Sequence, residues 1–367
     1  MPKSRLKKLF QVFGIVAILF TVIPIIELDF WWIRMFDFPH IQLTLLTLAA
    51  FLLYFIKFDV KKISDYVFVF ALSACLIYQF SKIYPYTVLS DYEVFNAENN
   101  KNTLSVYTCN VYQDNNKFDL IRGQIAKYNA DIILLTETNE KWLGEIKKGI
   151  YQDYTYRYEV PKENTYGMAL YSKLPLINPN VSYLVSDSVP SIHSKILLKS
   201  NDTIQLHAIH PTPPMPNHNT MSTDRDTHLM MIAKMALDSK YPVITVGDFN
   251  DVAWSETSKL FQEISRLLDV RKGRGFYNTY NAKNILMRWP LDHIFISSEF
   301  RLQTVEKCDY VGSDHFPLYT AFSFEPELKH EQTRPAPSAE DLKNAEDQIK
   351  SFKDNDKRRL TTNTATK

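Results

Sequence analysis

The stretch YPVITVGDFN, residues 241–250, shows how the second half of the chain folds. Its apolar part, VITV, is rich in β-branched residues and is typical of a buried strand. The strand ends in a glycine, Asp248 and Asn250, which favour a turn. A sheet fixes the side chains at a strand's end, and the following loop leaves them open to solvent. The stretch therefore predicts a strand that presents a carboxylate and an amide to a functional site, although Asp248 could also serve only as a turn residue.

Other apolar segments place polar residues at strand ends in the same way. Asn110 ends SVYTCN, Glu137 ends DIILLTE, His210 ends IQLHAIH, and Asp314 and His315 precede PLYTAF. Helical patterns such as FDLIRGQIAKYN and THLMMIAKMALDS lie between these segments. Residues 103–325 are therefore expected to alternate strands and helices, with several strands buried on both faces.

The polar residues at these strand ends suit a particular kind of chemistry. They supply carboxylates, amides and imidazoles, with no serine or cysteine nucleophile in a suitable context. That inventory fits a hard cation with oxygen ligands, such as Mg2+ or Mn2+, and does not fit a thiolate zinc site. Taken singly, Glu137 could cap a turn and His210 could be an ordinary loop histidine.

Six short blocks occur along residues 103–325 in one order. They are NV at 110–111, LLTE ending at Glu137, HPTPP at 210–214, GDFN at 247–250, PLDHIFIS at 290–297 and GSDHFP at 312–317. Together they resemble the signature blocks of the endonuclease/exonuclease/phosphatase superfamily, which has the deoxyribonuclease-I-like fold. The resemblance implies a four-layer α/β/β/α sandwich of two mixed sheets and metal-dependent hydrolysis of a phosphoester.

The resemblance also implies roles for individual residues. Glu137 would be a metal ligand, with Asn110 and Asp314 supporting the metal or its waters and Asn110 also near the substrate. These three residues belong to the blocks NV, LLTE and GSDHFP. A divalent cation there would neutralise charge on a phosphoester anion.

The catalytic roles implied by the resemblance fall on five residues. Asp248 and Asn250 would orient or activate the attacking water and hold a phosphate oxygen. His315 would contact the phosphate as a general acid/base or charged stabiliser, and His210 would lie near the leaving group. Asp292 would pair with His315, because a carboxylate raises a histidine's pKa and holds one tautomer. Neighbours on a strand face opposite sides, so His293, which follows Asp292, is assigned to the far face.

Three further residues are weaker candidates for substrate binding. Arg225 could reach a phosphate, although a solvated helix start is equally compatible with its place in the sequence. Arg274 and Tyr277 lie in GRGFYNTY, where a cation and aromatic rings could bind a base or line a lipid cleft.

The first 85 residues read as a membrane anchor. Three apolar segments, at about 9–26, 39–57 and 65–84, are long enough to cross a bilayer as transmembrane helices. The first follows KSRLKK but has no small-residue cleavage site and is followed by two more spans, so a retained anchor is expected instead of a signal peptide.

The loop charges predict an orientation for these spans. The N-terminus and the second loop, with Lys57, Lys61 and Lys62, are basic, whereas the first loop is acidic and carries Trp31 and Trp32. The positive-inside rule places the basic segments in the cytoplasm. An odd number of spans then puts the catalytic domain outside it, in the periplasm or cell exterior of what is expected to be a bacterial inner or plasma membrane protein.

The remaining segments carry less information. Residues 86–102 are expected to be a linker, and the polar tail 326–367 to be disordered or, at most, a loose helix near 338–353. Cys109 and Cys308 are the only pair available to a soluble domain, and two isolated buried thiols are expected.

These features predict a membrane-anchored phosphoesterase whose substrate is a lipid, a nucleic acid or a small molecule, with no obligate protein partner. The formal net charge of +1 gives no overall pull toward nucleic acid. A nuclease acting on extracellular nucleic acid stays open as an alternative, as does a catalytically inactive membrane receptor or scaffold.

Overall fold

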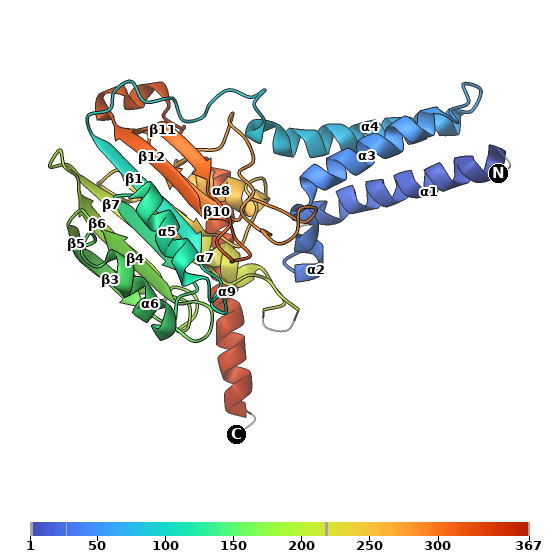
Figure 1. The fold of residues 1–367 in the computed structure, drawn as a ribbon. Helices are drawn as coiled ribbons and strands as arrows, with labels where there is room; N and C mark the ends of the chain where they lie inside the picture. Colours follow the sequence, from blue (N-terminus) through green and yellow to red (C-terminus); the bar gives the residue numbers. More distant parts are fainter. Residues whose placement is uncertain (1–2, 27, 217–218, 366–367) are drawn as a thin grey trace. The chain divides into compact units, whose positions relative to one another are not determined.

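The computed structural model describes residues 3–26, 28–216 and 219–365, and these form two compact units. The first unit comprises Met1–Asp91 together with Pro214–Ser222, and the second comprises Tyr92–Pro213 and Thr223–Lys367. Figure 1 shows that the first unit is helical and that the second holds the sheets. Because it contains the residues that the family resemblance marks as catalytic, we call the second unit the catalytic unit.

The first unit is built from long apolar helices. Its elements are α1 (Lys3–Val22), η1 (Ile23–Ile25), α2 (Trp31–Arg34), η2 (Met35–Asp37), α3 (His40–Phe55), α4 (Ile63–Ile83) and η3 (Tyr84–Tyr86). Two helices, Arg5–Ile25 and Ile63–Tyr86, are long and apolar enough to cross a membrane. A third span requires α3 to be joined to the preceding short helices across a 72° bend. The described residues therefore hold two or three candidate spans where the sequence predicted three.

Small residues and a few polar contacts join these helices. Ala17 of α1, Ala50 of α3 and Leu72 of α4 are buried in one cluster. The Lys7 ammonium pairs with the Asp65 carboxylate, which also accepts a hydrogen bond from the Asp59 backbone at 2.8 Å. This pair fixes the start of α1 beside the start of α4.

One six-stranded sheet of the catalytic unit has the strand order β11-β12-β1-β2-β4-β3. Its strands are β1 (Thr103–Asn110), β2 (Ile132–Thr136), β3 (Tyr156–Val160), β4 (Met168–Ser172), β11 (Phe300–Lys307) and β12 (Leu318–Phe324). β1 and β2 run parallel, and the other neighbours are antiparallel. The sheet is therefore mixed, and the ends of β1 and β2 lie at the same edge.

The second sheet has the order β5-β6-β7-β8-β10-β9. Its strands are β5 (Leu176–Ser182), β6 (Ser191–Leu197), β7 (Thr203–Ile209), β8 (Val243–Asp248), β9 (Leu268–Asp269) and β10 (Asp292–Ile296). β7 and β8 are parallel and adjacent, while β10 runs antiparallel to β8. The ends of β7 and β8 and the start of β10 consequently share one edge.

Strand residues alternate between an inner core and two outer ones. Leu134 of β2 and Val246 of β8 lie in the core between the sheets, whereas Ile133 of β2 faces the helices α5 (Phe118–Tyr128) and α6 (Glu140–Ile150). Ile209 of β7 packs under α7 (Thr223–Leu237), α8 (Glu256–Ser265) and the first part of α9 (Ala339–Ala365). Helices therefore cover each sheet on its outer face (Figure 1), and the predicted four-layer α/β/β/α sandwich is confirmed.

Two segments that the sequence predicts to be a polar tail and a linker contain residues packed into the core. The tail forms η4 (Pro326–Glu331) and α9, and Leu342, Ala345 and Ile349 pack into the outer core beneath them. These three apolar residues recur at helical spacing within an otherwise polar segment, so the overall composition concealed a narrow packing stripe. Residues 86–102, predicted to be a linker, include Val94, which is buried in the inner core.

The cysteines behave as expected. Cys75, Cys109 and Cys308 are all buried and free. Cys109 and Cys308 share the outer core under α5 and α6 without forming a disulfide.

Candidate active site

The amide of Asn110 links the two sheets at their shared edge. Its Nδ2 donates to Glu137 Oε1 at 2.9 Å and to Asp248 Oδ2 at 3.0 Å. Asn110 and Asp248 are buried, and Glu137 is partly buried. The carboxylate that follows β2 is thereby tied to the carboxylate that ends β8. Two strand ends far apart in the sequence meet at one polar site.

The turn after β8 holds Asp248 in a fixed position. Gly247 has a φ of +147°, and a Cβ there would lie 1.9 Å from the Ile209 carbonyl oxygen, so only glycine fits between β7 and β8. Asp248 Oδ1 accepts a hydrogen bond from the Asn250 backbone at 2.9 Å. The turn role that the sequence allowed for Asp248 is therefore present, and its other oxygen faces the site.

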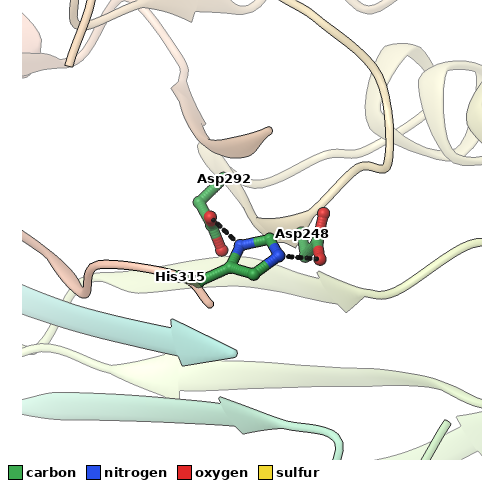
Figure 2. Close-up of side chains that lie close together, drawn as sticks. All are labelled: Asp248, Asp292 and His315. Carbon is green, nitrogen blue, oxygen red and sulfur yellow. Dashed lines mark hydrogen bonds and ion pairs between the residues drawn. The ribbon is translucent and has the colours of Figure 1, made fainter. Parts of the chain in front are cut away.

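His315 lies between two carboxylates, as Figure 2 shows. Its Nδ1 is 2.7 Å from Asp292 Oδ2, and its Nε2 is 3.6 Å from Asp248 Oδ2. The structure thus contains the predicted pair of His315 with Asp292, while His293 points to the far face and contacts Arg271 at 2.7 Å. Alternation along β10 produces this division.

Electrostatics favour a charged His315. Burial lowers the pKa of its imidazole, but the charges of Asp292 and Asp248 outweigh burial and raise the pKa to about 10. For Asp292, burial acts in the opposite direction and raises the pKa of the carboxyl. The charge of His315 and the hydrogen bond between the two side chains outweigh burial and hold the pKa of Asp292 below its ordinary value. The pair is therefore an imidazolium beside a carboxylate, and each partner stabilises the charge of the other.

His210 approaches the same carboxylate from the end of β7. Its Nε2 lies 3.7 Å from Asp248 Oδ2, and its ring centroid lies 5.5 Å from that of Tyr166. The adjoining Pro211 carbonyl accepts a hydrogen bond from Asn250 Nδ2 at 2.9 Å. Asn250 therefore uses its amide nitrogen to hold the segment that carries His210, where the sequence predicted a contact with phosphate.

Glu137 has a left-handed backbone conformation, which residues other than glycine rarely adopt. Its φ is +61°, and its Oε2 accepts a hydrogen bond from the Gln113 backbone at 3.2 Å. Among the residues that the structure describes, no lysine or arginine forms an ion pair with it. A partly buried carboxylate without a cationic partner, tied to a second carboxylate, fits a hard divalent cation.

Asn110 fits direct metal ligation less well than Glu137. Asn110 Oδ1 accepts from the Tyr112 backbone at 3.0 Å, so its amide nitrogen faces the carboxylates and orients them. The Asp314 carboxylate is 3.4 Å from the Ser313 hydroxyl, and its backbone carbonyl accepts from Ala282 at 2.6 Å. The expected supporting role of Asn110 is therefore to position carboxylates.

A second grouping at the site also has the chemistry to bind a metal. Asp248, Asp292 and His315 each offer one ligand atom, and these atoms lie within 4.8 Å of one another. However, Nδ1 of His315 already donates to Asp292, and a charged imidazole has no lone pair to give. We therefore take Glu137 as the residue that could hold a metal, with Asp248 beside it, and the pair of His315 with Asp292 as a fixed positive charge at the site.

The three weaker candidates for substrate binding lie elsewhere or are already engaged. Arg225 is buried and pairs with Asp226 at 2.8 Å and Asp251 at 3.3 Å. Its guanidinium also donates to the Asn250 carbonyl at 3.0 Å, so it braces the turn after β8. Buried acids that short-range sequence patterns do not reveal therefore occupy the Arg225 guanidinium, and its contact with phosphate stays a prediction.

Arg274 and Tyr277 belong to another part of the catalytic unit. The Arg274 guanidinium donates to Asn96 Oδ1 at 2.6 Å and lies 4.0 Å from the centroid of the Tyr92 ring. Tyr277 packs against the core between the sheets. In the described part of the chain neither is joined to Asp248 or His315, so the structure does not bring them into the site.

Two further residues, Ser313 and Tyr280, support the site. The Ser313 hydroxyl donates to the Asn110 carbonyl at 2.7 Å and accepts from the His315 backbone at 3.0 Å. The Tyr280 ring lies 5.0 Å from the His315 ring, measured between centroids. Ser313 stands directly beside Asp314 and His315 in GSDHFP and could have been suspected. Tyr280 lies in the aromatic stretch GRGFYNTY, and its position beside His315 depends on contact between segments that are far apart in the sequence.

Two mixed sheets in a sandwich, with carboxylates and histidines at their shared edge, are the arrangement expected of the phosphoester hydrolases that the motifs resemble. The model of the Endonuclease/Exonuclease/phosphatase family matches residues 107–315, more than half of the chain. The chain belongs to this family, whose members hydrolyse phosphoesters. Among curated proteins the sequence has no match.

Solved structures share the fold of the catalytic unit at low sequence identity. A D. rerio TDP2 complexed with single-strand DNA product is 16% identical, covers 61% of this chain and 100% of its own, and has a TM-score of 0.51. An endonuclease/exonuclease/phosphatase from Bacteroides vulgatus is 15% identical over 61% and 100% of the chains, with a TM-score of 0.51. The human Nocturnin catalytic domain with bound sulfate anion is 18% identical over 65% and 99%, with a TM-score of 0.50.

Proposed function

We propose that the chain is a membrane-anchored, divalent-metal-dependent phosphoesterase that hydrolyses its substrate by attack of water outside the cytoplasm. The observation that carries this proposal is the continuous network from Glu137 through Asn110 and Asp248 to His315 and Asp292. A receptor or scaffold would gain nothing from gathering three carboxylates and an imidazole at one edge, because removing charged groups from water costs free energy even when they are paired.

Glu137 is the residue that would hold Mg2+ or Mn2+, and the Asp248 carboxylate would lie beside the cation. Bound there, the cation would supply neutralisation of the charge on a phosphoryl oxygen. Asn110 keeps the two carboxylates apart and correctly turned by donating to both of them. The carboxylate chemistry favours these hard cations over zinc or copper.

The chain's own residues account for proton handling and charge stabilisation. His315, charged and fixed by Asp292, donates a hydrogen bond to a phosphate oxygen and stabilises the negative charge that grows there. Asp248 orients the attacking water and accepts its proton. His210, beside the same carboxylate, is placed to give a proton to the departing alkoxide oxygen. Each hydrolysis then breaks one phosphorus–oxygen bond and forms another from water.

The proposed side of the membrane follows from loop charge. The N-terminal segment and the loop at 57–62 are basic, and the Lys7–Asp65 pair holds the starts of α1 and α4 at one end of the first unit. Basic loops favour the cytoplasm, so three spans would place residues beyond about 86 on the other side. A reporter fused after residue 330 that works only in the cytoplasm would overturn this orientation.

The enzyme proposal is tested with the full chain in detergent or nanodiscs. We expect Mg2+- or Mn2+-dependent hydrolysis within a panel of bis-p-nitrophenyl phosphate, plasmid DNA and a phospholipid or sphingomyelin. Asp248→Asn should abolish it, whereas Asp309→Asn, at an exposed position away from the network, should not. Absence of metal-dependent turnover on every phosphoester would refute the proposal in favour of a receptor or scaffold. Activity on plasmid DNA alone would support the nuclease alternative.

A further inference from the structure

Residues 281–288 form a loop that projects from the catalytic unit on a paired base. The Tyr280 backbone donates to the Trp289 carbonyl at 2.9 Å, and the two rings stack with centroids 6.2 Å apart. One step further along, the Asn281 backbone donates to the Met287 carbonyl at 3.2 Å. The loop therefore leaves and rejoins the fold at one hydrogen-bonded point.

The base of this loop is joined directly to the candidate active site. Tyr280 makes a backbone bridge to His315, and their ring centroids are 5.0 Å apart. The Ala282 backbone donates to the Asp314 carbonyl at 2.6 Å. A movement of the loop would consequently displace His315, and a surface that contacts the loop would lie close to the candidate active site.

The tip of the loop is strongly apolar and exposed. Three consecutive residues, Ile285, Leu286 and Met287, have exposed fractions of 79%, 76% and 53%. Soluble surfaces usually carry such residues singly, and a contiguous exposed group marks a contact with a partner or membrane. No other run of three consecutive large apolar residues is exposed on the described part of the catalytic unit.

Cations flank the tip on both sides. Lys283 lies 4.2 Å from the Tyr112 ring centroid, and the Arg288 guanidinium donates to the carbonyls of Asn281 and Ala282 at 3.1 and 3.2 Å. Both side chains therefore stay near the base, while the apolar residues extend beyond them. An apolar tip with basic flanks matches a membrane surface, where acyl chains lie beneath anionic headgroups.

We propose that residues 281–288 insert their apolar tip into the bilayer that holds the first unit, and that the active site acts on the phosphoester headgroup of an amphiphile in that bilayer. We propose a lipid surface and not a protein as the partner of the loop tip. The same chain carries helices long and apolar enough to cross a membrane, so a bilayer would lie near the loop. The substrate part of this inference rests on the proposed phosphoesterase function; the insertion part does not.

Insertion is measured on the full chain in nanodiscs with an environment-sensitive fluorophore on Ile285→Cys. The native cysteines are all buried, so labelling is directed to the new thiol. We expect a blue-shifted emission that is quenched by brominated phospholipids. The matched control is Leu120→Cys on α5, where the leucine is 46% exposed, and it should report water. A water-like signal at 285, or a shielded signal that brominated lipid does not quench, would overturn the insertion.

The substrate class is tested with the double variant Ile285→Ser/Met287→Ser. Hydrolysis of a phospholipid in vesicles should fall about tenfold or more, because membrane contact is lost, while hydrolysis of water-soluble bis-p-nitrophenyl phosphate should stay unchanged. Leu120→Ser should change neither rate. Equal loss on both substrates would assign the tip a structural role and sink the substrate inference. If the unaltered chain hydrolyses neither, the proposed function fails, and the fluorescence experiment still decides insertion.

Discussion

Gly247 offers a sharp test of how the fold positions the site. It sits in β8 directly before Asp248 and opposite Ile209, the residue before His210. An added Cβ would lie 1.9 Å from the Ile209 carbonyl oxygen, and ordinary contact begins near 3.4 Å. The Gly247→Ala change therefore requires β7 and β8 to separate by about 1.5 Å at this point, which follows from those two distances.

That displacement acts on both stability and turnover. The φ of +147° is nearly restricted to glycine, and backbone strain with overpacking should lower the free energy of unfolding by about 2–6 kcal/mol. A shift of this size would also break the 3.0 Å hydrogen bond between Asn110 and Asp248. Because misplacement by about 1 Å can cost about a hundredfold in rate, we expect kcat/KM to fall by at least about that factor.

The assay compares kcat/KM on bis-p-nitrophenyl phosphate and the melting temperature of the catalytic unit for Gly247→Ala and a matched control. The control is Gly144→Ala on α6, where an added Cβ meets nothing within 4 Å. It should leave turnover unchanged and stabilise the helix by about 0.5–1 kcal/mol. If Gly247→Ala kept kcat/KM within about threefold of the parent, the proposed coupling of the β7–β8 contact to the site would be refuted.

Three further changes test the site and its support. Asp292→Asn should lower kcat by about 10²–10⁴-fold with little change in KM, measured by steady-state kinetics, because His315 loses its fixed charged partner; an unchanged kcat would remove Asp292 from the mechanism. Arg225→Met should lower the free energy of unfolding by about 3–5 kcal/mol in denaturant titrations by leaving Asp226 and Asp251 buried without their cation; a neutral effect would mean the acids find other partners. Stability should fall from about pH 6.5 toward pH 3, because burial lowers the pKa of His193 to about 4 and those of His207, His228 and His293 to about 3, so the unfolded chain binds these protons first; His228 alone contributes at most about 5 kcal/mol, and His228→Leu should reduce the slope of melting temperature against pH over that range.

The residues at strand ends were predictable from the sequence because their positions depend on local pattern. Apolar strands end where Asn110, Glu137, His210 and Asp248 stand, and parallel neighbours such as β1 with β2 bring their ends to one edge. The assignment of Asp292 to the site needed only strand alternation. The two-sheet architecture came from the ordered motifs, since alternating strands and helices fit other α/β folds as well.

What could not be predicted depends on contacts between distant segments. Arg225 stands in a charged stretch that looks solvated, yet the fold buries it against Asp251. The orientation of the Asn110 amide is set by the Tyr112 backbone, which no residue pattern encodes. Ala345 packs under a tail whose composition is polar overall, because burial follows a single helix face and not the average of a segment.

The central claim is that the Glu137–Asn110–Asp248 network serves a divalent metal in phosphoester hydrolysis. The most direct measurement is the Mg2+ dependence of bis-p-nitrophenyl phosphate hydrolysis by the full chain after treatment with EDTA, compared between the parent and Glu137→Gln. We predict that EDTA abolishes turnover, that Mg2+ restores it, and that Glu137→Gln raises the Mg2+ concentration for half-maximal rate by about 10–100-fold. Turnover that survives EDTA, or an identical Mg2+ dependence in the two proteins, would contradict the claim.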